Sequence, residues 1–192
     1  MKKQEPLNII LLGDPASGKG VQATRLIKKY HLYDFDMGRE VRKPAVRAGY
    51  DYAQTTAVGK LTPTSVARDI LRRVIKSVPK NKGILFNGHP KMIGEAYIVA
   101  SLLKKYKRLS PLVFYLSIPM HETLRRAAKR KREDDAEQAL KNRHRYYKNQ
   151  VSRVVAFFKK RYAFRNISGV GNRAEVEARI ASAIKQYLKH HI

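Results

Sequence analysis

The sequence predicts a single α/β domain, in which a central parallel β-sheet is covered by helices on both faces. Short apolar runs of strand length alternate with helical stripes along the chain, the pattern of folds built from strand–helix–strand units. A glycine-rich loop joins the first apolar run to the first helical stripe. A chain of 192 residues with 43% hydrophobic residues is long enough to bury one sizeable core.

The glycine-rich loop, residues 13–20 with the sequence GDPASGKG, follows a strand expected at residues 7–12. A helical stripe comes after it, formed by Ala23, Leu26, Ile27 and Tyr30. In this context G-x-x-x-x-G-K predicts phosphate binding. Glycines let successive N–H groups face an anion, the helix N-terminus adds its dipole, and Lys19 adds a full charge. The alternative is a tight turn with an exposed lysine.

Four further strands are expected, at residues 32–36, 83–87, 112–118 and 164–168. Further helices are expected at residues 63–78, 91–106, 125–132, 135–162 and 176–187. Thr62 before Pro63 is typical of a helix start, with a hydroxyl cap and a proline in the first helical position. Strands and helices therefore alternate to the end of the chain.

Composition excludes several classes of protein. The chain has no cysteine, so it has neither a disulfide framework nor a thiolate metal site. No apolar stretch reaches the length of a membrane span, and the charged residues 1–6 lead into a strand rather than a signal peptide. We therefore expect a cytoplasmic protein with no membrane partner.

The net charge is unusually high, because 41 Lys and Arg residues face 15 Asp and Glu residues, giving +26. Such an excess indicates contact with nucleic acid or adaptation to a polyanion-rich environment. The alternative is a basic background of solvated surface lysines, which the even spread of charge along the chain also fits.

Residues 13–22, G-x-P-x-S-G-K-G-x-Q, resemble the loop of adenylate kinases and related nucleoside monophosphate (NMP) kinases. In that family the loop usually ends G-K-G-T-Q, so Val21 stands for a threonine and Ala16 for a glycine. The resemblance covers nearly the whole chain. It implies a three-layer P-loop kinase fold over residues 1–192, with an NMP-binding segment near residues 37–66 and a short lid near residues 126–135.

The resemblance also implies a reaction, phosphoryl transfer from ATP to a nucleoside monophosphate, with Mg²⁺ accompanying ATP. AMP is the default acceptor (ATP + AMP = 2 ADP), and the enzyme is expected to be a monomer. The loop residues that would hold ATP are Gly13, Ala16, Ser17, Gly18, Lys19, Gly20 and Val21, with Gly171 near the base. Asp14 would place a carboxylate close to the phosphates and weaken binding slightly.

Three segments resemble the family's acceptor side. Residues 37–42 stand for T-G-D-x-x-R, residues 59–63 for G-K-L-V-P, and residues 87–91 for D-G-F-P-R. The residues expected to contact the acceptor are Met37, Gly38, Arg42, Lys60, Leu61, Thr62, Gly88, His89 and Lys91. His89 replaces a phenylalanine beside the acceptor, and Arg42 would grip the acceptor phosphate with a guanidinium fork.

Two departures in this segment predict slower turnover. The family's aspartate holds magnesium through water, and Asn87 keeps its shape without its charge, so the chain itself is expected to offer no direct metal ligand. Lys91 keeps the charge of the family's arginine but loses the bidentate fork.

Glu95 stands where the family places a glutamine that reads adenine. A carboxylate only accepts hydrogen bonds, so it would favour a guanine edge and GMP over AMP. The alternative is a solvent-facing glutamate that offsets nearby lysines, four residues after Lys91 on the same helix face.

The basic run at residues 125–132 resembles the family's short lid. Arg126 and Arg130 would close over ATP, while Arg132 and Arg143 would bind the acceptor or the migrating phosphoryl group. Phosphoryl transfer is catalysed by positioning and by cations around the moving phosphate, and a closing lid also excludes water. Taken alone, such a run is also typical of a solvated or nucleic-acid-binding helix.

A second functional hypothesis remains open at this point. A kinase fold with weakened activity, acting as a basic nucleic-acid- or ribosome-associated binder, would account for the +26 charge. It would also account for the departures from the family pattern at Met37, Val21, Asn87, Lys91 and Glu95.

Overall fold

The computed structural model describes residues 6–47, 49–51, 62–130 and 137–191, with side chains in all but residues 47, 129–130, 137–148 and 190–191. The strands are β1 Ile9–Gly13, β2 Tyr33–Phe35, β3 Ile84–Asn87, β4 Leu112–Ser117 and β5 Phe164–Ser168. The helices are α1 Lys19–Tyr30, α2 Met37–Val41, α3 Pro44–Arg47, α4 Thr64–Ser77, α5 Ile93–Lys105, α6 Met120–Arg130, α7 Glu137–Arg161 and α8 Arg173–His191.

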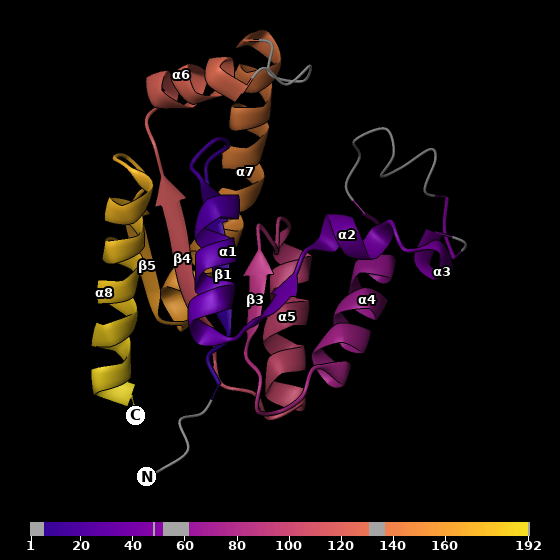
Figure 1. The fold of residues 1–192 in the computed structure, drawn as a ribbon. Coiled ribbons are helices and arrows are strands. Elements are labelled where there is room, and N and C mark those ends of the chain that lie inside the picture. The colour runs from indigo at the N-terminus through magenta and orange to yellow at the C-terminus, as the bar shows by residue number, and fades with distance from the viewer. Residues whose placement is uncertain (1–5, 48, 52–61, 131–136, 192) are drawn as a thin grey trace.

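The five strands form one parallel sheet in the order β2-β3-β1-β4-β5 (Figure 1). The strand β1 lies at its centre, with Ile10 opposite Phe86 of β3 and Leu11 opposite Phe114 of β4. A parallel sheet needs a crossover after each strand, which the helices provide. The predicted α/β class with a parallel sheet is confirmed.

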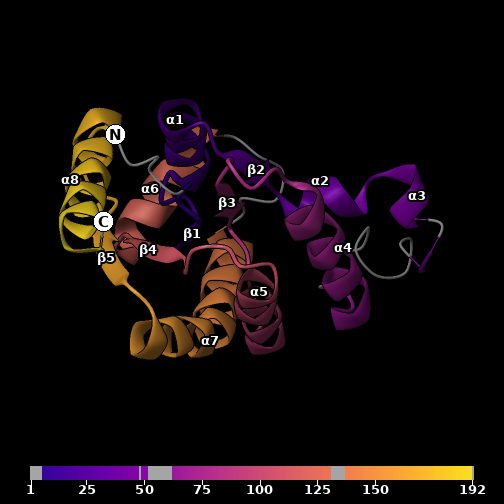
Figure 2. The ribbon, with the colours of Figure 1, turned by 90° about the horizontal axis from the view of Figure 1, so that it is seen from below.

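Side chains of β1 alternate between two apolar cores, one on each face of the sheet. Ile9 and Leu11 pack with residues of α1 and α8, whereas Ile10 and Leu12 pack with residues of α4, α5 and α7. Viewed along the sheet, α1 and α8 lie on one side and α5 and α7 on the other (Figure 2). The three-layer arrangement predicted from the sequence is therefore correct.

Two local predictions were wrong. The helix α4 begins at Thr64 rather than Pro63, its N-cap is Pro63, and no side chain caps it, so Thr62 is not the hydroxyl cap. The helix α5 begins at Ile93, so Lys91 precedes it and does not share a helix face with Glu95. In both cases the residue before the helix, Pro63 or Met92, has non-helical backbone angles, so the helix begins one or two residues later than predicted.

All five strands point the same way, so the loops after them meet at one edge of the sheet, where α/β proteins bind ligands. The glycine loop after β1, the segment after β3 and the turn after β5 all lie there (Figure 1). In the described ranges, no helix is both long and apolar enough to cross a membrane.

Candidate active site

The glycine loop between β1 and α1 is shaped by close backbone contacts. A Cβ on Gly13 would stand 2.5 Å from the carbonyl oxygen of Leu116, so only glycine fits beside β4. Ala16 and Gly18 have positive φ angles of 61° and 89°, which turn the chain sharply before α1. The N-cap of α1 is Gly18, and no side chain caps this helix end. The first N–H groups of α1 are therefore left for an anion.

Lys19 folds back over this loop. Its ammonium group donates to the carbonyl oxygens of Gly13 and Asp14, each at 2.7 Å, and lies 3.4 Å from the Ser17 hydroxyl. These oxygens are uncharged, so the ammonium group can exchange them for phosphate oxygens without breaking a salt bridge to them.

Asp14 does not face the phosphate site, which corrects the expectation that it weakens binding. Its carboxylate accepts from the Tyr115 hydroxyl at 2.6 Å and from the backbone N–H of Ile118 at 2.9 Å. The residue is 7% exposed. Asp14 thus ties the glycine loop to β4 and to the segment that leads into α6.

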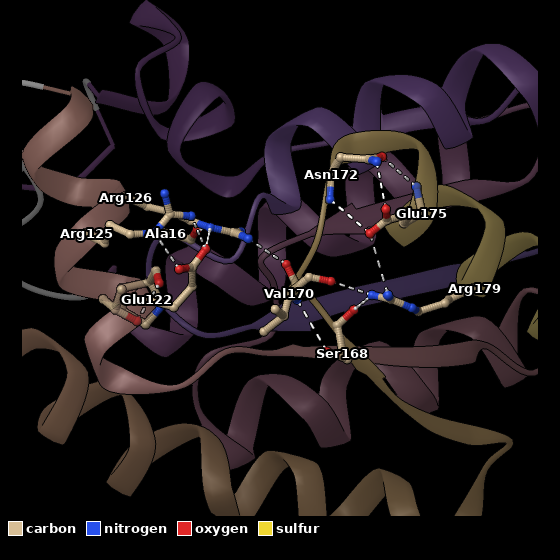
Figure 3. Close-up of polar contacts among 12 residues, drawn as sticks. Ala16, Glu122, Arg125, Arg126, Ser168, Val170, Asn172, Glu175 and Arg179 are labelled. Carbon is tan, nitrogen blue, oxygen red and sulfur yellow. Dashed lines mark hydrogen bonds and ion pairs between the residues drawn. The ribbon is translucent and has the colours of Figure 1, made fainter.

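Arg126 of α6 joins three parts of the site (Figure 3). Its guanidinium group donates to the carbonyl oxygens of Gly169 at 2.8 Å and of Ala16 at 3.4 Å. The Glu122 carboxylate accepts hydrogen bonds from Arg126 at 2.6 Å and from Arg125 at 2.7 Å. Hydrogen bonds from these two arginines lower the pKa of Glu122 to about 2, so the carboxylate is ionised at neutral pH and orients both side chains.

The turn after β5 is fixed from α8 (Figure 3). Asn172 accepts from the backbone N–H groups of Ala174 and Glu175 at 2.9 and 3.0 Å, and Glu175 accepts in return from Asn172. Arg179 donates to the carbonyl oxygens of Ser168 and Val170 at 2.9 and 2.5 Å. This reciprocal capping fixes the turn relative to the start of α8.

One cavity of about 1210 Å³ opens between the glycine loop, α6 and the turn after β5. The predicted ATP-binding residues that line it are Ala16, Ser17, Gly18, Lys19, Gly20, Val21, Arg126 and Gly171. Gly13 lies just beneath, where its carbonyl oxygen receives Lys19. The glycine loop, Arg126 and Gly171 are far apart in sequence, and the structure brings them together around this cavity.

On the acceptor side, Gly38 makes room for Arg42 at the end of α2. A Cβ on Gly38 would stand 3.2 Å from Nη1 of Arg42 and 3.2 Å from Oδ1 of Asp36, the N-cap of this helix. Met37 is the first residue of α2, and Arg42 is exposed. Gly38 and Arg42 therefore act as a pair. Thr62 is buried at the start of the segment before α4.

Glu95 is buried, which excludes the alternative that it faces solvent. It is 3% exposed, and its Oε2 accepts from the backbone N–H groups of Lys91 and Met92 at 2.8 and 3.1 Å. Burial raises the pKa of this carboxyl, against the N–H donors and Lys91. Because this oxygen is engaged with backbone, the geometry gives no support to a guanine preference.

His89 lies beside Glu95 in the same buried position. It is 2% exposed, its ring centroid is 5.3 Å from that of Phe35, and its Nδ1 is 3.6 Å from Oε2 of Glu95. Its Nε2 is buried without a hydrogen-bond partner. Burial, helped by the charge of Lys91, lowers the pKa of His89 to about 3, so the imidazole is neutral.

The other acceptor and lid predictions are only partly covered. Gly88 has a φ of 65° and follows Asn87 at the end of β3, and Lys91 is exposed just beyond. Lys60, Leu61 and Arg132 lie outside the described residues. Arg130 and Arg143 are described by their backbone alone, as the last residue of α6 and a residue of α7. Their roles stay predictions.

No cluster of three or more His, Cys, Asp or Glu side chains suited to a metal occurs in the described part of the chain. Near the glycine loop, side-chain oxygens include the Ser17 hydroxyl, 3.4 Å from the Lys19 ammonium group, and the Thr123 hydroxyl, 3.5 Å from the carbonyl oxygen of Pro15, whereas Asp14 is turned toward β4. These neutral oxygens suit an ion that arrives bound to phosphates and keeps its water.

Sequence reasoning missed several residues of the site. Glu122 could have been found, because it precedes Arg125 and Arg126 by three and four residues on a helix. Asn172 and Glu175 could also have been found from their capping spacing. Gln22 and Arg25 both reach the carbonyl oxygen of Arg173, at 2.9 and 3.5 Å, and line the cavity. Gln22 ends the loop motif at residues 13–22, which could have identified it, whereas Arg25 meets Arg173 only through tertiary packing.

A parallel sheet whose first strand runs through a glycine loop to a lysine at a helix N-terminus places this protein in the class of P-loop phosphotransferases. The family model of adenylate kinase matches residues 11–163. The chain therefore belongs to the adenylate kinase family. It is a nucleoside monophosphate kinase that transfers a phosphoryl group from ATP to AMP.

Individual relatives agree with this assignment. An adenylate kinase of Bacteroides thetaiotaomicron is 29% identical over 186 residues, covering 93% of this chain and 98% of the relative. An adenylate kinase of Azobacteroides pseudotrichonymphae is 32% identical, and the match covers 93% of this chain and 97% of the relative. An adenylate kinase of Stenotrophomonas maltophilia is 31% identical, and the match covers 93% of this chain and 100% of the relative. The likeness therefore extends over nearly the whole of each chain.

Proposed function

We propose that ATP occupies the 1210 Å³ cavity, with its phosphates against residues 16–21 and Lys19. Arg126 then lies over the phosphates, and the turn at residues 169–172 lies beside the base. One observation carries this proposal: a glycine loop, an uncapped helix N-terminus and an arginine from α6 line a single cavity. Each of them binds anions, so together they fit a polyphosphate.

The acceptor AMP is proposed to lie between α2 and the segment after β3. Arg42 and Lys91 are exposed there and would bind its phosphate, with Arg132 and Arg143 on the migrating group. Arg42 offers a planar fork for phosphate oxygens, whereas Lys91 offers a single point charge. We expect the weaker grip at Lys91 to limit turnover rather than to abolish it.

Catalysis is proposed to rest on positioning and charge, with no covalent intermediate on the protein. Lys19 and Arg126 would stabilise the charge on the phosphoryl group as it moves, and the segment after α6 would exclude water. Magnesium, brought with ATP, would neutralise the β- and γ-phosphates, and Asn87 would contact it through water. Glu122 keeps Arg126 oriented throughout, through its 2.6 Å hydrogen bond.

A coupled assay with ATP and each of AMP, GMP, CMP and UMP tests this function. We expect ADP formation with AMP, and a kcat/KM about 10²- to 10³-fold lower with a Lys19→Met variant. Preferred use of GMP would overturn the acceptor assignment. No product with any acceptor, combined with salt-sensitive RNA binding, would support the degenerate binding protein instead. The monomeric state and the cytoplasmic location stay predictions, which sedimentation and cell fractionation would test.

A further inference from the structure

A second cavity, of about 650 Å³, lies at the edge of the sheet opposite the ATP cavity. It is bounded by α5, by the end of α7 and by Pro111, the residue before β4. Tyr162, just before β5, also lines it. These positions are at the amino ends of the strands, whereas the glycine loop is at a carboxyl end. Figure 2 shows α5 and α7 side by side on one face of the sheet.

Three aromatic side chains form part of its wall. Tyr97 packs edge-to-face on Phe157, with ring centroids 4.6 Å apart, and Phe157 lies 6.1 Å from Tyr162. Tyr97 is 55% exposed, and among the described residues only Val170 joins it as an exposed large apolar side chain. Val170 belongs to the turn at the ATP cavity. Tyr97 has no comparable explanation in the kinase reaction.

Three cationic side chains complete the wall, namely Lys104, Arg108 and Arg161. The Arg161 guanidinium group lies 4.7 Å above the ring of Phe157. Arg108 donates to the carbonyl oxygens of Ile75 at 3.2 Å and Lys82 at 3.0 Å. None of the residues that line the cavity is acidic. The positive charge of this wall is therefore not offset locally.

The positive surface continues beyond this cavity. A smaller cavity of about 190 Å³ shares Arg108 and is lined by Lys80 and Lys107 as well. No carboxylate lies within ion-pair distance of any of these five cations in the part of the chain that is described. A row of cations that passes an exposed aromatic ring suits a ligand with phosphates at intervals and bases between them.

We propose that this surface, defined by Tyr97, Phe157, Tyr162, Lys104, Arg108 and Arg161, binds single-stranded nucleic acid independently of the kinase site. A base would contact Tyr97, and the flanking phosphates would contact Lys104 and Arg161, with the strand continuing past Arg108. An acidic peptide would use the cations but gain little from the exposed aromatic ring. The net charge of +26 adds long-range attraction for the same polyanion.

The test measures binding of fluorescent oligouridylate and oligothymidylate, about 12 nucleotides long, to the full chain by anisotropy. A saturating bisubstrate analogue keeps the ATP and acceptor sites filled. We expect Tyr97→Ala to weaken binding by about 5- to 150-fold, the loss typical of one stacked base. We expect Arg161→Gln to lower the slope of log affinity against log salt by about 0.7, as for one lost contact to a single strand.

Matched variants separate this surface from general charge. Lys185→Gln removes an exposed charge on α8 and is expected to leave both affinity and slope almost unchanged. Lys104→Gln and Arg161→Gln change exposed side chains, so they test the proposal even if Tyr97→Ala fails to fold. All variants should keep the wild-type kinase rate, because none of these residues contacts the ATP cavity.

Three outcomes would overturn the proposal. The first is equal weakening by Lys185→Gln and Arg161→Gln, which would mean that binding follows net charge alone. The second is release of the oligonucleotide by the bisubstrate analogue, and the third is equal competition by an oligoglutamate of the same length. Similar affinity for both oligonucleotides would show that base and phosphate suffice. Preference for one would show that the surface senses the 2′-hydroxyl group or the thymine methyl group, the two features in which they differ, and either result supports the proposal.

Discussion

The proposed ATP side and the proposed acceptor side of the molecule use their polar groups differently. On the ATP side, Lys19 and Arg126 donate to backbone carbonyl oxygens at 2.7 and 2.8 Å. On the acceptor side, Glu95 accepts from backbone N–H groups, and Arg39 is paired with Asp34 at 2.8 Å. The ATP side thus presents cations to a ligand, whereas many polar groups of the acceptor side hold the local fold.

This difference indicates how firmly each side is expected to bind the phosphates of its nucleotide. Carbonyl oxygens are weaker partners for a cation than phosphate oxygens, so ATP can displace them at little cost. The proposed ligands of the acceptor phosphate, Arg42 and Lys91, are both exposed. We therefore expect the ATP side to be sensitive to loss of one charge, and the acceptor side to be open to improvement.

Lys19→Met should have the largest effect on activity. Loss of its charge from the glycine loop should lower kcat/KM by about 10²- to 10³-fold, the usual effect of removing one preorganised charge donor. The coupled assay gives the rate, and Lys28→Met, an exposed change on the same helix, is the control. If the two variants lost activity equally, the ATP side would not depend on this charge.

His89→Phe should change the pH dependence of stability. The folded chain keeps His89 neutral down to about pH 3, whereas the unfolded chain takes up a proton below about 6.5. The free energy of unfolding is therefore unaffected by His89 protonation above about pH 6.5, and it falls by about 1.4 kcal/mol for each pH unit below that value. As the pH is lowered from 7 to 5, the free energy of unfolding of the phenylalanine variant should therefore rise by about 2 kcal/mol relative to that of wild type.

Urea unfolding at several pH values measures this difference. Glu95 is present in both proteins, and its raised pKa acts in the opposite direction, because the folded chain then takes up a proton before the unfolded chain does. Comparing the two proteins isolates His89. Parallel stability curves from pH 7 to pH 5 would show that the imidazole is not held neutral in the fold.

The sequence predicted the order of the elements better than the directions of individual side chains. The order of strands and helices followed from apolar periodicity, and the glycine loop placed Lys19 at the right helix end. The directions of side chains were not predictable: Asp14 was expected near phosphate and instead binds Tyr115 and Ile118. Glu95 was expected to contact the acceptor base, with a solvent-facing position as the alternative. Its carboxylate is buried and accepts from two backbone N–H groups at a helix start, an orientation that no sequence pattern indicated.

The double variant Asn87→Asp, Lys91→Arg should strengthen the acceptor side. The aspartate would restore a charge for magnesium held through water, and the arginine would restore a bidentate fork. We expect turnover to rise about tenfold, which corresponds to roughly 1.4 kcal/mol in the barrier. Single-turnover kinetics with AMP measure it, and each single variant shows which change acts. An unchanged rate would mean that these two positions do not limit phosphoryl transfer.

Gly38→Ala should give a smaller, more selective effect on the same side. The new Cβ would stand 3.2 Å from Nη1 of Arg42 and from Oδ1 of Asp36, so the guanidinium group must shift by a few tenths of an ångström. Alanine is the better helix former by about 1 kcal/mol, so α2 itself should not be weakened. We expect KM for AMP to rise about two- to fivefold, with KM for ATP unchanged, because the loss is in one directional contact. In an Arg42→Ala background the same change should have no further effect, since the pair is then already broken. Additive losses in the double variant would show instead that Gly38 acts on the acceptor site without Arg42.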